Sequence, residues 1–164
     1  MRSILLATAF AAAGLSLGAS SAAHAAGGGA DPSPQIQTKP VDPNFARAKQ
    51  MIEGRDYRNA VPLLQQVVQK DPRNADAYNL MGYSMRMSGD ANGSLQYYQQ
   101  ALAIDPRHLG AHEYIGEAYL MLNRPAEAEQ HLARLDSLCV FGCTEYRMLK
   151  SAIANYKQGR RASN

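Results

Sequence analysis

Residues 75–108 decide the fold of this chain, and they read ADAYNLMGYSMRMSGDANGSLQYYQQALAIDPRH. Gly89-Asp90 divides the stretch into two halves, and Asp105-Pro106 closes it. Within each half, large apolar residues recur three, four or seven positions apart, which is the spacing of an amphipathic α-helix. The stretch therefore predicts two helices joined by a short turn.

The same pattern recurs on both sides of this stretch at a fixed period. Asp71-Pro72 precedes Asp105-Pro106 by one period, and small or apolar residues fall into register with these pairs. The columns are Ala60, Ser94 and Ala128; Leu64, Tyr98 and Leu132; Val67, Ala101 and Leu135; Ala48, Gly82 and Gly116; Met51, Met85 and Tyr119. One helical pair cannot bury its apolar face alone, so a fixed period indicates stacked units. We expect three units, 41–74, 75–108 and 109–142.

Helix-start and helix-stop signals place the helices within these units. Asp42-Pro43 supplies an N-cap and a first-turn proline, and Asn123-Arg124-Pro125 breaks the third unit in the middle. A seventh helix begins after Thr144, which we expect as its N-cap. The predicted helices are Pro43–Glu53, Tyr57–Lys70, Ala75–Ser88, Ala91–Ile104, Leu109–Leu122, Pro125–Leu138 and Thr144–Gln158.

The repeating unit resembles the tetratricopeptide repeat, and residues 75–108 match its pattern best, through Tyr78, Met81-Gly82, Gly89-Asp90, Tyr98, Ala101 and Pro106. The first unit departs from the pattern at Arg47, where the family has Leu, and at Arg55, where it usually has Gly. In the third unit Val140 replaces the closing proline. The resemblance implies an all-α fold, a right-handed superhelical stack of three helix pairs. The helix over 144–158 would cap the end of a repeat domain spanning 42–158.

The resemblance also implies that the first helices of the pairs line a concave groove for a protein partner. Fixed positions in each unit would point into it. In this chain they include Phe45, Lys49, Asn79, Tyr83, Arg86, Met87, Glu113, Glu117 and Leu120. Tyr and Arg are frequent binding hot spots, and such a groove suits an extended peptide or a helix. Some relatives clamp a C-terminal carboxylate with Lys and Asn, but Phe45 and Lys49 stand at those positions, so we do not expect that clamp.

Residues 1–25 have the features of a secretory signal peptide. Arg2 precedes an uncharged apolar stretch over 4–18, and Ala23-His24-Ala25 forms a small-x-small cleavage site before Ala26. The apolar stretch is shorter than the ~20 residues of a spanning helix, so a membrane anchor is disfavoured. Residues 26–41 are rich in Gly and Pro, and we expect a flexible linker there. Residues 159–164 form a short tail.

Two cysteines, Cys139 and Cys143, are the only ones in the chain. Export into an oxidising compartment favours a disulfide, and Cα atoms of residues i and i+4 on a helix lie about 6 Å apart, which is within disulfide range. We expect a structural disulfide that ties the seventh helix to the third pair. A redox-active pair and a thiolate metal site remain alternatives. The spacing differs from that of haem-attachment and two-residue oxidoreductase motifs.

Signals for catalysis and for nucleic-acid binding are weak. His108 and His112 are spaced like metal ligands on a helix, but no further ligands accompany them, so we expect core or capping roles. We expect His131 on the surface. Glu113 and Glu117 are spaced as general acid/base work permits, yet a solvated helix face looks the same. The 17 basic and 14 acidic residues are mixed along the chain, with no basic stripe.

The sequence thus predicts a protein that is exported, has no membrane span and resides in the periplasm. We expect a scaffold or adaptor that binds a protein partner in its groove, without enzymatic activity, cofactor, metal or nucleic acid. The alternative is a thiol-redox or metal-handling accessory protein that uses Cys139 and Cys143. Self-association, with the groove filled by a second copy, is a further possibility.

Overall fold

The computed structural model describes residues 41–159, and every regular element in this range is an α-helix. The helices are α1 (Pro43–Glu53), α2 (Tyr57–Lys70), α3 (Ala75–Met87), α4 (Ala91–Ile104), α5 (Leu109–Met121), α6 (Pro125–Leu138) and α7 (Thr144–Lys157). All seven predicted helices are confirmed, and α3, α5 and α7 end one residue earlier than predicted. The predicted signal peptide, the linker up to residue 40 and the tail from residue 160 lie outside the described residues.

Side-chain caps explain why several helices begin where they do. The Asp42 carboxylate accepts a hydrogen bond from the Asn44 backbone N–H at 2.7 Å, and Pro43 follows as the first helical residue, as predicted. The expected cap of α7 is wrong: Thr144 is already helical, and Cys143 is the N-cap. Its Sγ accepts from the Tyr146 N–H at 3.4 Å. Helix α7 does not begin earlier, because the backbone of Cys143 is extended, with φ −134° and ψ 168°.

The turn inside each helix pair uses the same backbone conformation. Arg55, Gly89 and Asn123 stand at the same position of the three successive units, and their φ values are 63°, 96° and 57°. Glycine takes this left-handed conformation without strain, whereas arginine and asparagine incur a steric cost. The departure at Arg55 therefore changes the residue and keeps the turn.

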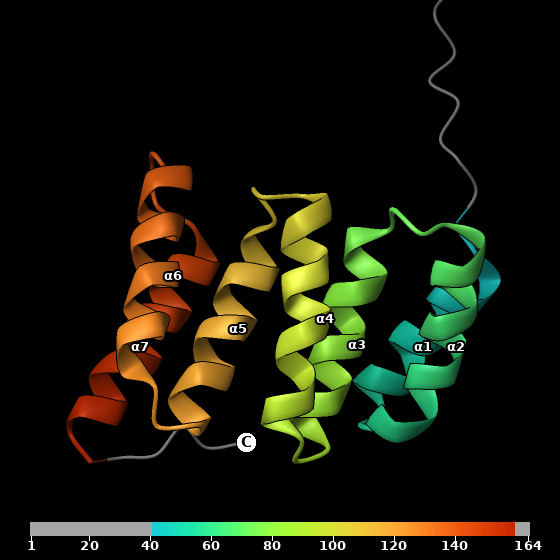
Figure 1. Cartoon of the computed structure of the whole chain (residues 1–164), viewed down its shortest axis with the longest axis horizontal. Coiled ribbons are helices and arrows are strands. Elements are labelled where there is room, and N and C mark those ends of the chain that lie inside the picture. The colour runs from blue at the N-terminus through green and yellow to red at the C-terminus, as the bar shows by residue number, and fades with distance from the viewer. Residues whose placement is uncertain (1–40, 160–164) are drawn as a thin grey trace, which may run out of the picture. The chain divides into compact units, whose positions relative to one another are not determined.

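The helices stack in chain order, and Figure 1 shows α1 and α2 at the opposite end of the stack from α6 and α7. Each helix packs against the next, and α1, α3, α5 and α7 also contact one another in succession. Among residues 41–159, no Cα atom of one even-numbered helix lies within 8 Å of a Cα atom of another. The odd-numbered helices thus form a continuous inner layer, which is the layer predicted to carry the groove. No helix in the described range is long and apolar enough to cross a membrane.

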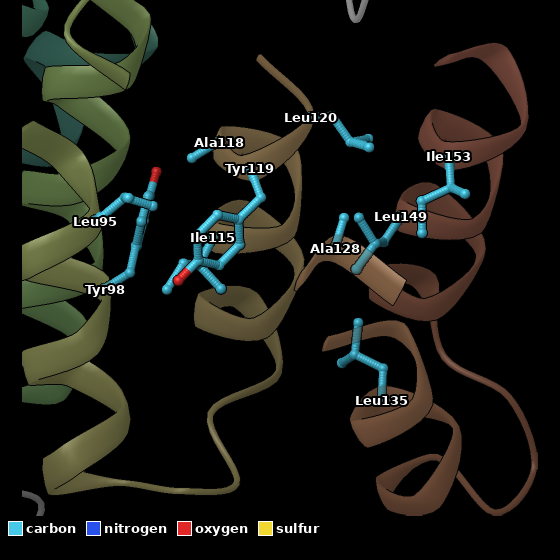
Figure 2. Close-up of a cluster of buried hydrophobic side chains, with 10 residues drawn as sticks. All are labelled: Leu95, Tyr98, Ile115, Ala118, Tyr119, Leu120, Ala128, Leu135, Leu149 and Ile153. Carbon is cyan, nitrogen blue, oxygen red and sulfur yellow. The ribbon is translucent and has the colours of Figure 1, made fainter. Parts of the chain in front are cut away.

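Two hydrophobic clusters form the core. The first lies among α1, α2 and α3, and consists of Ala48, Ala60, Leu64, Val67, Ala77 and Met81. The second extends from α4 to α7, and Figure 2 shows Leu149 and Ile153 of α7 pointing into it. Small residues allow this close packing: a Cβ added at Gly116 would lie 2.6 Å from Leu149 Cδ2. The helix α7 therefore closes the end of the stack, as expected of a cap.

Candidate functional site

The inner layer carries a hollow of about 620 Å³, which we call the aromatic pocket. It is formed by the end of α1, the first residue of α2, the middle and end of α3 and the first half of α5. Its lining residues are Ile52, Glu53, Arg55, Tyr57, Leu80, Tyr83, Met87 and Tyr114. Apolar and aromatic side chains make most of this lining, and charges stand only at Glu53 and Arg55. This composition is typical of a site that takes an apolar side chain.

Three tyrosine rings give the pocket its shape. Tyr83 lies between the other two, with its ring centroid 5.9 Å from that of Tyr57 and 5.0 Å from that of Tyr114. The Tyr57 and Tyr83 rings meet edge to face, at 74°. Such contacts hold aromatic side chains in place beyond what their buried area contributes. The contacts among the rings therefore preorganise the pocket wall.

A buried cation supports this wall from behind. Arg86 is only 5% exposed, and its guanidinium lies 5.5 Å and 5.7 Å from the ring centroids of Tyr83 and Tyr114. Its Nη2 donates to Glu117 Oε2 at 2.9 Å. Removing one member of a buried ion pair leaves an uncompensated charge, which is strongly destabilising. Arg86 therefore positions the rings and joins α3 to α5, and its charge is used within the protein.

Glu113 is a second buried polar group near this cluster. Glu113 is 3% exposed, and its Oε1 atom has no hydrogen-bond partner. Burial raises the pKa of Glu113 to about 8, and the charges of Glu117 and Glu145 add to the effect. At neutral pH the carboxyl is therefore mostly protonated. It is part of the packing between α5 and its neighbours and does not present a charge to the groove.

Some of the nine residues predicted for the groove are accessible, and others are buried. Tyr83 and Met87 line the aromatic pocket, Lys49 is exposed, and Glu117 is partly exposed beside Arg86. Four of the predicted residues are buried and correct the expectation of an accessible surface: Asn79, Arg86, Glu113 and Leu120. Leu120, for example, is 2% exposed in the second core cluster because α7 covers that part of α5. The pocket residues Tyr57, Leu80 and Tyr114 were not predicted, since they stand outside the groove positions that the repeat pattern assigns.

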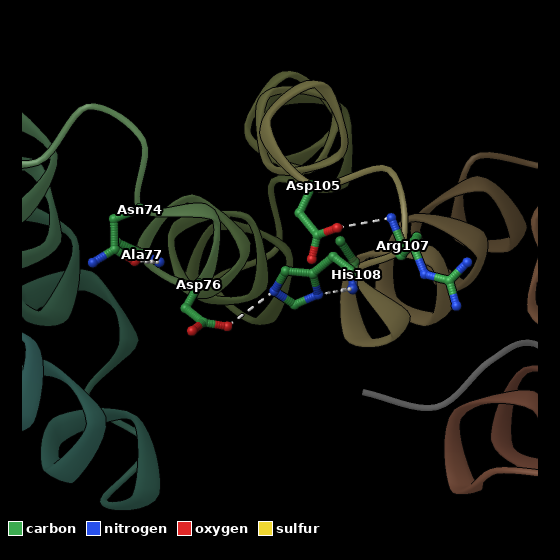
Figure 3. Close-up of polar contacts among 7 residues, drawn as sticks. Asn74, Asp76, Ala77, Asp105, Arg107 and His108 are labelled. Atoms are coloured by element: carbon green, nitrogen blue, oxygen red, sulfur yellow. Dashed lines mark hydrogen bonds and ion pairs between the residues drawn. The ribbon is translucent and has the colours of Figure 1, made fainter. Parts of the chain in front are cut away.

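Phe45, the remaining predicted residue, lines a second hollow of about 490 Å³ at the start of α1. Asp76 shares this hollow and accepts a hydrogen bond from His108 Nε2 at 3.0 Å, as Figure 3 shows. His108 Nδ1 accepts from the Ala111 N–H at 3.1 Å, so the ring caps α5 as predicted. The hydrogen bond from His108 lowers the pKa of Asp76. Both ring nitrogens of His108 are therefore engaged in hydrogen bonds, and the imidazole is not free to bind a metal ion.

His112 and His131 form a hydrogen-bonded pair between α5 and α6. Their Nδ1 atoms lie 2.9 Å apart, and His112 Nε2 lies 3.2 Å from the Pro106 carbonyl oxygen. The carbonyl can only accept, so His112 carries its proton on Nε2, and His131 donates from Nδ1 to His112 Nδ1. His112 is buried, as expected, but His131 is half-buried, which corrects its predicted surface position. Within residues 41–159, no group of three or more His, Cys, Asp and Glu side chains is arranged to hold a metal ion.

The two cysteines are joined in a disulfide, with Cα atoms 5.6 Å apart. Cys139 is the C-cap of α6 and Cys143 the N-cap of α7, so the bond closes the turn between these helices, as predicted. Gly142 allows the turn through a φ of 79°. Both sulfur atoms are used in this bond and do not offer thiolate ligands.

Two models of tetratricopeptide repeats match the chain, over residues 45–107 and 85–153. The chain belongs to the tetratricopeptide repeat family. Among curated relatives, Tmtc3 of Drosophila melanogaster, a protein O-mannosyl-transferase, is 35% identical over 83 residues, which are 51% of this chain and 9% of the relative. FlbA of Caulobacter vibrioides is 32% identical over 98 residues, which are 58% of this chain and 16% of FlbA. The tetratricopeptide chain thus aligns with a small part of each relative.

Solved structures of other proteins share this repeat fold. The type III secretion translocator chaperone SycD of Yersinia enterocolitica has a TM-score of 0.63 at 16% identity, covering 73% of this chain and 84% of SycD. SycD in complex with a peptide of the translocator YopD gives a TM-score of 0.61 at 16% identity, covering 71% and 88%. A double mutant of MamA gives 0.55 at 22% identity, covering 58% and 53%. At these identities the likeness shows the fold alone.

Proposed function

We propose that this tetratricopeptide repeat protein is a scaffold that binds an extended peptide or a helix of a protein partner on its inner layer, with an apolar side chain of the partner in the aromatic pocket. The observation that carries the proposal is the preorganised pocket of about 620 Å³, formed by Tyr57, Tyr83 and Tyr114 beside Met87. Aromatic residues are enriched among binding hot spots, and Met adapts to varied shapes. SycD, which shares the fold, has been solved with a bound peptide of YopD, and this supports a peptide as ligand.

We also propose that the protein acts after export, in the periplasm, and that it has no catalytic activity of its own. The features of residues 1–25 support export. The named transferase activity of Tmtc3 belongs to a protein of which this chain matches 9%. N-terminal sequencing of the protein from a periplasmic fraction tests the location: we expect Ala26 as the first residue. Recovery of the uncleaved chain from the cytoplasm alone would refute the export proposal.

Site-specific photo-crosslinking in the native host tests the pocket. A photoreactive residue replaces Met87 in one variant and Gln99, an exposed position on α4, in the control. We expect a defined partner polypeptide to be crosslinked from position 87 and not from position 99. A Tyr83→Ala change should reduce that crosslink at least tenfold, because it removes the central ring of the pocket wall. Equal crosslinking from both positions would contradict the proposal.

A further inference from the structure

The turn between α6 and α7 exposes two large apolar side chains, which we call the apolar tip. Val140 is 81% exposed and Phe141 is 100% exposed. They stand between Cys139 and Cys143, whose disulfide closes the turn, and the Gly142 N–H donates to the Cys139 carbonyl at 2.9 Å. Contiguous exposed apolar side chains mark interaction sites. Because the turn is closed covalently, little conformational entropy is lost when the tip binds.

The aromatic pocket of the same chain is complementary to this tip. The pocket is lined by three tyrosine rings, and a phenylalanine ring packs well against tyrosine in edge-to-face contacts. Phe141 does not fill the pocket of its own chain, since it is fully exposed, and α6 and α7 make no contact with α1, α2 or α3. Figure 1 shows the α6–α7 turn at the opposite end of the stack from α1. Only a second copy can bring tip and pocket together.

Charges of both signs stand beside each of the two surfaces. Glu53 and Arg55 stand at the pocket, and Glu145 and Arg147 stand in the first turn of α7, directly after the tip. Each surface can therefore offer either sign of charge to the other. Complementary charges at the rim of an apolar contact favour association and fix its orientation.

We propose that the apolar tip of one copy docks in the aromatic pocket of a second copy, with Phe141 as the anchor. The contact is heterologous, so each copy keeps one free tip or one free pocket after pairing, and the assembly grows head to tail into a chain or closes into a ring. The inference rests on the proposed function, because it gives the same pocket a self-derived ligand that competes with a protein partner.

A complementation experiment with the mature, disulfide-bonded protein tests this assembly by sedimentation velocity. Phe141→Asp removes the anchor but leaves the pocket, and Met87→Lys places a charge in the pocket but leaves the tip. We expect the unaltered protein to associate with rising concentration, and each variant to weaken this association at least tenfold. An equimolar mixture of the two variants should restore one contact and stop at a 1:1 dimer. The control Val41→Asp, which removes a 67% exposed side chain before α1, should associate like the unaltered protein.

Several results would overturn the inference. They are a monomeric unaltered protein, full association of Phe141→Asp, or no dimer in the mixture when circular dichroism shows that both variants are folded. Tyr83→Ala serves as a second variant that alters the pocket and leaves the tip. Phe141-dependent co-sedimentation with phosphatidylglycerol vesicles, without any dimer in the mixture, would assign the tip to a lipid surface instead. The proposed function is tested separately: the partner crosslink from position 87 should persist in Phe141→Asp, whose pocket is open.

Discussion

The His112–His131 pair makes folding stability sensitive to acid, and the structure determines the direction. The bond between the two Nδ1 atoms requires one proton between them, and the Pro106 carbonyl holds another on His112 Nε2. A further proton on His112 would go to Nδ1 and set two N–H donors against each other. A further proton on His131 would go to Nε2, where burial opposes the positive charge. Burial lowers the pKa of His131 from 6.5 to about 4, and the neighbouring His112 adds to the effect. Burial also lowers the pKa of His112, with Arg134 and His108 contributing.

The size of the effect follows from linkage. Above pH 6.5 neither the folded nor the unfolded state binds the extra proton, so the full stability is present. Between pH 6.5 and about 4, His131 binds a proton in the unfolded state but not in the folded state. Each pH unit in this range therefore lowers the free energy of unfolding by up to ~1.4 kcal/mol. At about pH 4.5 the loss amounts to ~1–3 kcal/mol, the lower value allowing for solvent screening of a half-buried ring. That corresponds to a fall in Tm of roughly 4–12 °C.

Thermal unfolding at about pH 7.5 and pH 4.5 measures this loss, and the repeat itself supplies the control. Tyr78 and Tyr97 stand in the second unit where His112 and His131 stand in the third, so the variant His112→Tyr/His131→Tyr carries what the second unit has at these positions. We expect its Tm to fall less between the two pH values than that of the unaltered protein, by the amount given above. The same fall in both proteins would refute the reasoning, as would an NMR titration placing the pKa of His131 at or above 6.5.

Three further changes have defined outcomes. Gly82→Ala should destabilise the protein by about 1–2 kcal/mol in urea unfolding, because the new Cβ would lie 2.6 Å from Tyr98 Cε1. The control Gly54→Ala should be tolerated, because its new Cβ would lie 3.5 Å from the nearest atom. Equal effects of the two changes would contradict this packing. Glu113→Gln should raise Tm at about pH 8 and leave it unchanged near pH 4.5, since only the ionised carboxylate is disfavoured by burial; a gain independent of pH would argue against it. Arg55→Gly should stabilise the first turn by up to ~1 kcal/mol, and a loss would show that φ 63° carries little strain there.

Much of the fold could be predicted because its signals are local. Asp42-Pro43 starts α1 through its own side chain and ring, and Asp105-Pro106 stops α4 wherever the chain lies in space. The repeat period then places Gly82 and Gly116 at close helix contacts. The cap of α7 was assigned to the wrong residue because Cys143 takes that role through a disulfide-closed turn, and cysteine is not a usual N-cap.

The candidate site could be predicted only in part. Position in the repeat correctly brought Tyr83 and Met87 to the inner layer, but it assigned Arg86 and Glu113 to an accessible surface. Their burial depends on which side chains the neighbouring helices contribute. Arg86 is enclosed by rings from two helices, and Glu113 lies near Glu145 of α7.

The sequence by itself determined that this protein is a stack of three helical pairs with a capping helix, since period, caps and turn residues act within a few positions of the chain. The tertiary structure alone decided which of the inner-layer residues are accessible. Tyr57 and Tyr114 belong to different repeat units and meet at one pocket only because α1, α3 and α5 pack side by side. Burial of a side chain depends on the atoms that surround it in space, and spacing along one chain does not specify those atoms.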